Sequence, residues 1–391
     1  MATRAVPARV GYTPIGYYVW VGFLSALVLM GLYAFFVQTT EGQYLTGESD
    51  IVPWGLYIAA FVFFVGASAG GTVIGLMIHG FGRKDYAPLG TRALLMGLFC
   101  LAGAVLFILA HVGNLPRAFL MPWVWRNPTS MFMYTSVTYY MFGSLILAEL
   151  YFAVRIARGV ATERDRKAAK WLAIAAVPFA LGVLHAPHGA LFAVIKARPF
   201  WNSPLLPPHF AVVALVSGTA IMLQVALITS ALAKKALVGA QTLSHMGALL
   251  AFFIAVAGFL DFFDLLVFTY SDATSGNEAA HFLGDVHLPL SILHAGGYLI
   301  AFGILLFPKG RTTPGLAIAS LIAIIAVAAY RYNLTVVGVS VSLFSFIPHE
   351  HYSPQWIEAF VSIGIVALVL LLYSVAIKVV PLEEEAIAPE S

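Results

Sequence analysis

Residues 53–80 decide the fold of this chain, and they read PWGLYIAAFVFFVGASAGGTVIGLMIHG. The stretch contains no Asp, Glu, Lys or Arg, and it exceeds the roughly 20 apolar residues with which a helix crosses the hydrocarbon core of a membrane. Its Gly-rich part, residues 66–71, lies inside the apolar run, so it is not a phosphate-binding loop. Small residues there allow neighbouring helices to approach closely. The stretch therefore predicts a membrane-spanning helix.

The rest of the chain has the same character. Of its 391 residues, 61% are hydrophobic and only 10% are charged, and the mean hydropathy is +0.90. Soluble domains carry about 25% charged residues. This composition excludes a cytosolic enzyme, a disordered chain and a secreted disulfide scaffold, because too little polar surface remains to face water. It predicts an all-α, polytopic membrane protein.

Ten segments are long and apolar enough to span a membrane, and the connections between them are short. We therefore expect a single integral membrane domain over residues 1–391. The first run follows a short basic N-terminus without an evident cleavage site, so we interpret it as a membrane helix and not as a cleaved signal. The predicted spans are 16–37, 52–80, 91–112, 131–156, 171–196, 206–233, 242–270, 286–307, 313–338 and 355–380.

The distribution of Lys and Arg predicts the orientation. With the N-terminus in the cytoplasm, most of the 21 Lys and Arg residues fall in cytoplasmic connections, as the positive-inside rule requires. The outer connections 38–51 and 271–285 carry only acidic charges. We expect a multi-pass membrane protein with both termini in the cytoplasm. The exceptions to the charge bias are Arg117, Arg126, Lys196, Arg198 and Arg331.

Four of these exceptions lie in two outer loops that combine Arg, Asn, Pro and Trp. The loops read HVGNLPRAFLMPWVWRNPTS (111–130) and KARPFWNSPLLPPH (196–209). One interpretation is ordinary anchoring at the membrane interface, which suits Trp. The other is a structured outer platform that docks another subunit or an anionic headgroup.

Ionisable side chains at membrane depth are costly, which makes them functional candidates. Five segments place such groups in the outer half of the membrane. His185 and His188 are three residues apart and share a helix face, and Asp261 and Asp264 have the same spacing. The remaining candidates are His111, Arg331, His349, Glu350, His351 and Glu358.

This set of groups is what a quinone site needs. A quinone has two carbonyls and takes up two protons with two electrons, so histidine or carboxylate must hydrogen-bond a carbonyl and carry a proton. We predict this role for His185, His188, Asp261, Asp264, Arg331 and His111. Each of them also has a structural interpretation, and Asp264 with Arg331 is a candidate buried pair. Glu149, toward the inner end of its segment, either begins a proton route from the cytoplasm or reaches toward Arg155 or a nearby basic group.

The sequence gives no indication of haem, an iron–sulfur cluster, a metal ion or nucleic acid as a ligand. A membrane di-haem cytochrome needs axial histidines in pairs at two depths, and the histidines of this chain do not form two such tiers, so we expect no haem. One cysteine, Cys100, cannot hold an iron–sulfur cluster, and we expect no metal site. There is no basic stripe with interleaved aromatics, so we expect no nucleic-acid partner.

Three stretches together resemble one family: PWGLYIAAFVFFVGASAGG (53–71), RPFWNSPLLPPHFAVVALVSGTA (198–220) and PQWIEAFVSIGIVAL (354–368). They are similar to the NrfD/PsrC family of quinone-interacting membrane subunits, above all its ten-helix HybB/HmcC/DsrP-like members. His185 matches a histidine of those members, Asp264 stands at their Glu, and Arg331 and Glu358 match in kind. His111 replaces the acid with which the family's loop usually begins, which puts that acid's proton chemistry in doubt here.

The resemblance implies two four-helix bundles, about 52–196 and 206–338, flanked by helices 16–37 and 355–380. It implies a quinone, menaquinone or ubiquinone, as exchangeable substrate, and we expect His185, Asp264, Trp54 and Tyr57 to bind it. It also implies a ferredoxin-like iron–sulfur subunit docked at loops 113–130 and 196–208, further subunits of a redox complex, and membrane lipids. The chain would be one subunit of an oxidoreductase and not an enzyme alone. A proton or ion transporter and a purely structural anchor remain the alternatives.

Overall fold

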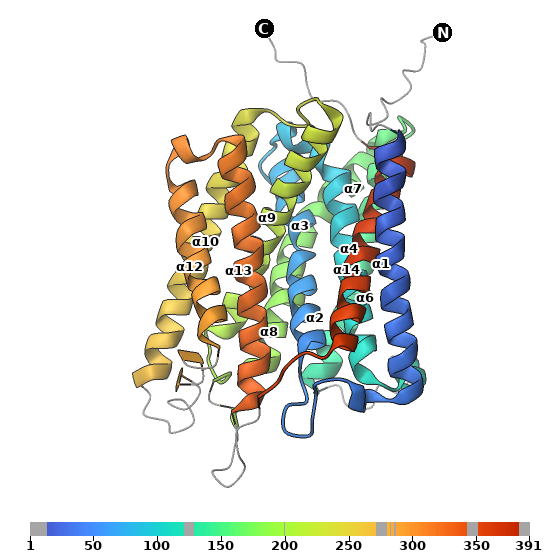
Figure 1. The fold of residues 1–391 in the computed structure, drawn as a ribbon. Coiled ribbons are helices and arrows are strands. Elements are labelled where there is room, and N and C mark those ends of the chain that lie inside the picture. Colours follow the sequence, from blue (N-terminus) through green and yellow to red (C-terminus); the bar gives the residue numbers. More distant parts are fainter. Residues whose placement is uncertain are drawn as a thin grey trace, which may run out of the picture.

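A computed structural model describes residues 14–120, 129–198, 200–270, 280–281, 283–284, 287–341 and 351–382. Over these ranges the chain is helical and has no strand, and ten helices are long and apolar enough to cross a membrane. The all-α fold and the ten predicted spans are therefore confirmed. Figure 1 shows the helices standing side by side, with α10, α12 and α13 at the left of the view and α1 and α14 at the right.

The α-helices are α1 (Pro14–Glu41), α2 (Leu56–Ala67), α3 (Gly70–Gly75), α4 (Gly90–Val112), α5 (Leu115–Leu120), α6 (Met131–Ala157), α7 (Glu163–Pro178), α8 (Ala186–Ala193), α9 (Leu206–Ala233), α10 (Ala240–Tyr270), α12 (Leu288–Leu306), α13 (Thr313–Ser340) and α14 (Trp356–Val379). Short 3₁₀ turns are η1 (Gln43–Leu45), η3 (Lys84–Leu89) and η5 (Pro308–Gly310). Two π-helical segments are η2 (Leu76–Gly80) and η4 (Phe179–His185).

The fifth spanning segment begins earlier than its predicted start at residue 171. Thr162 caps α7 in a capping box: its side chain accepts from the Asp165 amide at 3.2 Å, and its own amide donates to the Asp165 carboxylate at 2.7 Å. A capping box satisfies the free amides of a first turn whatever the polarity of that turn. The helix therefore begins at Glu163 and carries a charged turn beyond the apolar region.

The π-helical segments interrupt two of the spans. η2 ends the span that begins with α2, and η4 lies between α7 and α8 and ends at His185. Pro187 follows η4 directly and has no amide to donate to the preceding turn, which fits the irregular hydrogen bonding at this junction. Single-turn π segments occur often at functional sites, because they turn side chains out of the regular helical register.

The start of α1 and the end of α14 lie at the same face of the helix array. The Tyr17 hydroxyl, near the start of α1, donates to the Ser374 carbonyl near the end of α14 at 3.3 Å. The two helices cross closely, because a Cβ atom on Gly31 would lie 2.6 Å from the Gly364 Cα. We call the end at which α1 begins and α14 ends the terminal face, and the opposite end the distal face (Figure 1).

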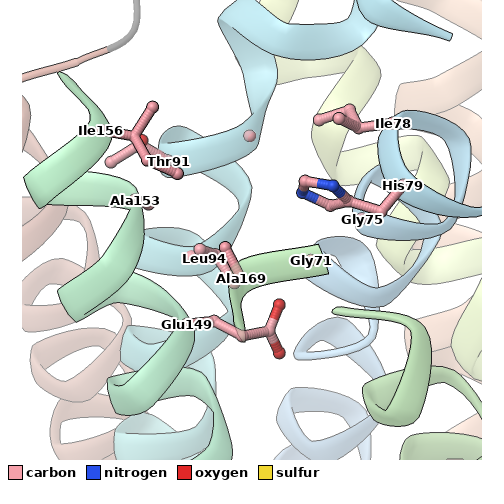
Figure 2. A pocket seen from close by; sticks show the side chains of 11 residues that line it. Gly71, Gly75, Ile78, His79, Thr91, Leu94, Glu149, Ala153, Ile156 and Ala169 are labelled. Carbon is pink, nitrogen blue, oxygen red and sulfur yellow. The ribbon is translucent and has the colours of Figure 1, made fainter. Parts of the chain in front are cut away.

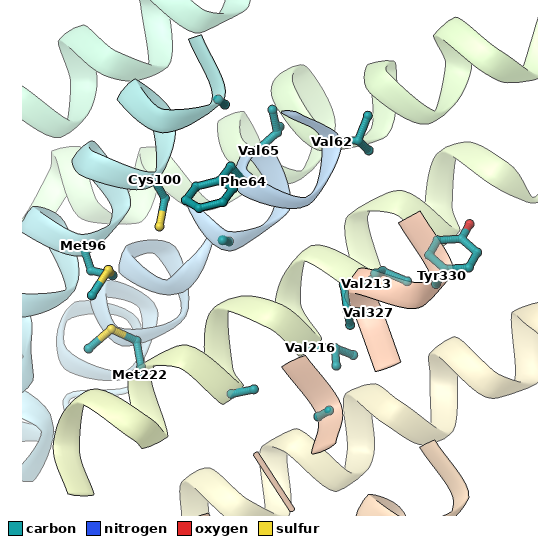
Figure 3. Close-up of a cluster of buried hydrophobic side chains, with 14 of the residues drawn as sticks. Val62, Phe64, Val65, Met96, Cys100, Val213, Val216, Met222, Val327 and Tyr330 are labelled. Atoms are coloured by element: carbon teal, nitrogen blue, oxygen red, sulfur yellow. The ribbon is translucent and has the colours of Figure 1, made fainter. Parts of the chain in front are cut away.

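α2 lies at the centre of the molecule, where it packs against α4, α9 and α13. Figure 3 shows Val62 and Val65 of α2 near Val213 and Val216 of α9 and Val327 of α13. Further along the same span, α3 meets α9 at two glycines: a Cβ atom on Gly218 would lie 2.5 Å from the Gly70 nitrogen. The small residues of 66–71 therefore do allow close helix approach, as their sequence predicts. The division into bundles at 52–196 and 206–338 stays a prediction.

Candidate functional site

Three helices bring an acid and two histidines together in the distal half. Asp261 of α10 lies 3.2 Å from His209 Nε2 of α9 and 3.3 Å from His294 Nε2 of α12. On the other side of the His209 ring, Nδ1 lies 3.0 Å from the Tyr330 hydroxyl of α13. Tyr298, one turn along α12, stands edge-on to the His294 ring at 4.8 Å between centroids. We call Asp261, His209, His294, Tyr298, Tyr330 and Arg331 the Asp261 cluster.

Arg331 is the charged centre of this cluster, and its side chain is 1% exposed. Its guanidinium carbon lies 4.0 Å from the Phe210 ring centroid and 5.3 Å from that of Tyr330. Within the described residues, neither Nε nor Nη1 has a hydrogen-bond acceptor. A buried charge without a partner is costly. The cluster thus offers two unused donors to a ligand that carries carbonyl or anionic oxygen.

The Tyr298 hydroxyl of the cluster has no hydrogen-bond partner among the described residues. His209 Nε2 and His294 Nε2 share a single carboxylate, that of Asp261, which lies within ion-pair distance of both. Buried polar atoms without a partner are uncommon in folded proteins, and each of them suggests a missing ligand, ion or water.

The cluster is buried on one side and reaches the lipid-facing surface on the other. The Asp261 side chain is 25% exposed, whereas that of His209 is only 3% exposed. Phe262 and Leu265 beside Asp261 on α10, and Ile292 on α12, are exposed apolar residues. A head group at Asp261 would therefore sit next to a surface suited to an apolar tail.

His185 and His188 belong to a second group, formed by α6, η4 and α8. The Tyr139 hydroxyl hydrogen-bonds His188 Nε2, and His188 Nδ1 lies 2.5 Å from the Leu184 carbonyl. His185 is 1% exposed, and its Nε2 has no hydrogen-bond partner in the described part of the chain. Its ring stands edge-on to Phe142 at 6.3 Å. The predicted site is thus distributed over two groups of residues.

Asp264 does not form the pair with Arg331 that the sequence suggested. Its carboxylate accepts a hydrogen bond from the Ser203 hydroxyl, in the loop before α9. The three-residue step along α10 moves Asp264 toward the distal face by almost one helical turn, and Arg331 lies among aromatic rings instead.

His111 and Glu358 hold the distal connections in place. His111 Nδ1 lies 3.1 Å from the Glu48 carboxylate, which also accepts from the Gly55 amide at 3.0 Å. Glu358 accepts from the Gly47 amide at 2.7 Å, from the Gln355 amide at 2.9 Å, and from the Tyr352 hydroxyl. These bonds fasten the 42–55 connection to α4 and to the entry of α14. In the sequence, Glu48 was only one of the acidic residues of the outer connection 38–51. Its pairing with His111 could not be predicted from the sequence.

Trp54 and Tyr57 are packed into the protein at the same end. The Trp54 ring stacks on Trp201 at 5.2 Å, and the Trp201 indole donates to the Leu334 carbonyl at 2.7 Å. The Tyr57 hydroxyl donates to the Gln38 side chain at 2.5 Å. Trp54 is thus connected to α13 through Trp201, and Tyr57 connects α2 to α1. The predicted contact of both residues with quinone stays a prediction.

Glu149 lines a cavity in the terminal half of the molecule. The cavity has a volume of about 70 Å³, and His79 of η2 lies across it from Glu149 of α6 (Figure 2). Arg155 is not a partner of Glu149, because its guanidinium pairs with Asp165 at 2.9 Å. The structure therefore does not contain the predicted contact between Glu149 and Arg155.

Arg198, one of the predicted platform residues, holds the end of α13. Its Nη1 donates to the Val339 carbonyl at 3.2 Å and to the Val341 carbonyl at 2.5 Å. Burial lowers the pKa of this guanidinium from its ordinary value. Two other predicted platform groups, Arg126 and the side chain of Arg117, lie outside the described residues. The ionisable candidates His349 and Glu350 also lie outside them. Within the described ranges, no group of three or more His, Cys, Asp or Glu residues is arranged to hold a metal ion.

Comparison with known sequences identifies the family. The family model described as polysulphide reductase, NrfD, matches residues 44–346. The chain belongs to the NrfD family. The matched range of this NrfD protein contains both histidine groups, Arg331 and Glu149, and it ends before Glu358.

Several relatives of this NrfD protein are similar over most of their length. The chain is 26% identical to the Hdr-like menaquinol oxidoreductase integral membrane subunit of Archaeoglobus fulgidus, over 96% of each chain. It is 24% identical to the menaquinone reductase integral membrane subunit of Nitratidesulfovibrio vulgaris, over 93% of this chain and 91% of the relative. It is 28% identical to the probable Ni/Fe-hydrogenase 2 b-type cytochrome subunit of Escherichia coli, over 84% of this chain and 83% of the relative.

Proposed function

We propose that this NrfD protein is the quinone-reactive membrane subunit of a respiratory oxidoreductase complex, and that the quinone head group binds at the Asp261 cluster. One observation carries the proposal: Asp261 lies between two histidines, beside a buried arginine with two unused donors. The menaquinol oxidoreductase and the menaquinone reductase among the relatives support a quinone as substrate.

The chemistry follows from the residue types. His294 and Arg331 would donate hydrogen bonds to quinone carbonyl oxygens, and the arginine would stabilise the negative charge that develops on them. Asp261 can accept the protons that a quinol releases as its two electrons leave, and it can return protons when a quinone is reduced. Tyr330, through its contact with His209 Nδ1, would hold that imidazole in one orientation.

The partner and the orientation are further parts of the proposal. An iron–sulfur subunit on loops 113–130 and 196–208 would lie over the distal face, and the Asp261 cluster is in the distal half. Electrons would therefore cross a short distance between that subunit and the quinone. The positive-inside bias supports an orientation with the distal face outside the cytoplasm and both termini within it, and the proposed location is a prokaryotic inner membrane.

The arrangement of the histidines in the two groups gives no support to a haem, although one relative is named a b-type cytochrome subunit. His185 and His188 follow each other along one helix, so they cannot ligate opposite sides of one haem. His209 and His294 face each other from two helices, but both nitrogens turn toward Asp261. We therefore propose that the chain acts without a haem of its own.

A photoreactive azido-menaquinone tests the site directly. On the intact complex we expect labelled peptides from α9, α10 and α12, and we expect excess menaquinone to prevent the labelling. Labelling confined to α6 and α8 would move the site to the His185 group. Labelling that menaquinone does not compete with would contradict a specific quinone site. A reduced-minus-oxidised optical spectrum of the purified chain checks the haem proposal, which a b-type α band would overturn.

A further inference from the structure

Glu149 lines two neighbouring internal spaces. The first is the cavity of about 70 Å³ that it shares with His79, and the second is a space of about 10 Å³ lined also by Ser68, Thr72 and Phe142. A cavity needs about 10–15 Å³ of this kind of volume for one water molecule. The first space can therefore hold several waters, and the second is close to the size of one.

The carboxyl group of Glu149 has no partner within the described part of the protein. It is 8% exposed, and the described residues provide it with no hydrogen bond and no ion pair. The nearby cations are engaged elsewhere or lie at the rim: Arg155 pairs with Asp165, the Arg92 guanidinium donates to the Pro88 carbonyl, and Lys170 is exposed on α7. A buried carboxylate without a partner is costly, whereas a carboxylic acid beside water is not.

The two spaces lie between the terminal face and His185. His79, in the last turn of η2, is partly exposed and lines the first space. Glu149 lines both spaces, and Phe142 lines the second. Beyond Phe142, and edge-on to its ring, lies the His185 imidazole, whose Nε2 has no partner among the described residues. Protonatable groups and water-sized spaces thus alternate from the terminal face toward the centre of the protein.

We propose that Glu149 is a proton-accepting site that takes up protons from the terminal face and passes them toward His185. A hydronium ion in the His79 cavity gives its proton to a Glu149 oxygen and leaves a water molecule. The acid then gives the proton, through a water in the second space, to His185 Nε2, which becomes an imidazolium. Phe142 is the barrier, and its ring must turn away for the second transfer. The use of that proton rests on the proposed quinone chemistry, but the binding of a proton at Glu149 does not.

Carbodiimide labelling tests the binding step without any redox chemistry. Dicyclohexylcarbodiimide is apolar and reacts with carboxylic acids that stay protonated inside membranes. On the full chain we expect it to modify Glu149, as read by mass spectrometry, and to leave the exposed Glu163 unmodified. Absence of modification at Glu149, with carboxyls elsewhere in the chain labelled, would overturn the proposal.

Proton uptake during turnover tests the transfer step. The complex is reconstituted in vesicles with a pH dye on the terminal side, and Glu149→Gln is compared with Glu163→Gln, the same change at an exposed position of that face. We expect Glu149→Gln to lower uptake at least tenfold and Glu163→Gln to leave it unchanged. Ala153→Leu, which fills the first cavity and keeps the carboxyl, should also lower uptake. If the complex without substitutions transferred no electrons to or from quinone, that result would count against the proposed quinone function. Normal uptake in both Glu149→Gln and Ala153→Leu would overturn the Glu149 route alone.

Discussion

Arg331 lies across the face of Phe210, with its guanidinium carbon 4.0 Å from the ring centroid. The π face attracts the cation, but it uses none of the guanidinium hydrogen-bond donors. The neighbour of Phe210 in the chain is His209, so one turn of α9 supplies both the ring that holds the arginine and an imidazole that faces Asp261. The contact with Phe210 therefore holds the Arg331 guanidinium in the cluster. It leaves Nε and Nη1 without an acceptor among the described residues.

Asp261 and Asp264 provide a matched pair of variants on one helix. We expect Asp261→Asn to lower quinone-linked electron transfer at least tenfold, which corresponds to about 1.4 kcal/mol, because the proton acceptor between the two histidines is lost. Asp264→Asn should change the rate less than twofold, since its partner is Ser203. The measurement is the steady-state rate of assembled complex with menaquinol. Equal rates for the two variants would show that Asp261 has no special role.

Arg331→Met should separate stability from activity. Replacing a buried charge that lacks a carboxylate partner with an apolar side chain of similar length should stabilise the fold, by about 1–3 kcal/mol. Quinone-linked turnover should fall strongly, because the carbonyl donors disappear. Thermal unfolding in detergent and turnover are measured on the same preparation. A variant that is less stable than the unmodified chain would mean that Arg331 has a structural partner.

Gly338→Ala should disturb the distal end of α13. A Cβ atom there would collide with the indole of Trp201, which donates to the Leu334 carbonyl and stacks on Trp54. Overpacking of this kind costs about 1–3 kcal/mol. Gly303→Ala is the control, because nothing lies within 4 Å of its Cβ position on α12. The melting temperatures should fall for the first variant and stay level or rise for the second.

Charge reversal on the distal loops tests the partner. We expect Arg117→Glu with Arg126→Glu to release the iron–sulfur subunit, and to do so more completely as ionic strength rises, because exposed pairs are screened beyond about 8–10 Å. Arg158→Glu, on the terminal face, should release nothing. Co-purification of the complex in low and high salt provides the measurement. A doubly reversed protein that keeps its partner would exclude these arginines as the docking site.

Arg198 is unsuited to that experiment. Its guanidinium holds two carbonyls at the end of α13, so Arg198→Glu should destabilise the membrane subunit itself.

The orientation can be tested with fused reporters. A reporter that is active only outside the cytoplasm should work within residues 38–51 and 271–285, and it should fail within 157–170. The reverse pattern would place the Asp261 cluster in the cytoplasmic half of the membrane and would contradict the proposed position of the partner.

The sequence predicted the ten spans because the length of an apolar run measures directly what a bilayer requires. It misplaced the start of α7, since the capping box at Thr162 acts independently of hydropathy. The depth of Asp261 and Arg331 along their helices was enough to identify both as candidates. Their contact residues could not be predicted, because tertiary packing decides which helices face each other.

His209 and His294 show this limit most clearly. Their depth in the membrane did not form the two tiers that haem requires, so they were assigned no role from the sequence. In the structure both lie within 3.3 Å of one carboxylate, that of Asp261. Tyr139, Tyr330 and Glu48 were missed for the same reason: each is defined by a partner on another helix or loop. His294 and Tyr298 are four residues apart and therefore share one helix face. Their contact could have been predicted from the sequence, because it depends on one helix alone.

The close crossing of α1 and α14 has a consequence for how the protein is made. α1 and its main neighbour, α14, are separated by most of the chain. At about 5–20 residues per second, roughly 15–65 seconds pass between the synthesis of Glu41 and that of Trp356. During this time the Gly31 face of α1 cannot yet contact Gly364 of α14. The closing of α1 onto α14 therefore cannot begin before residues 356–379 have been made.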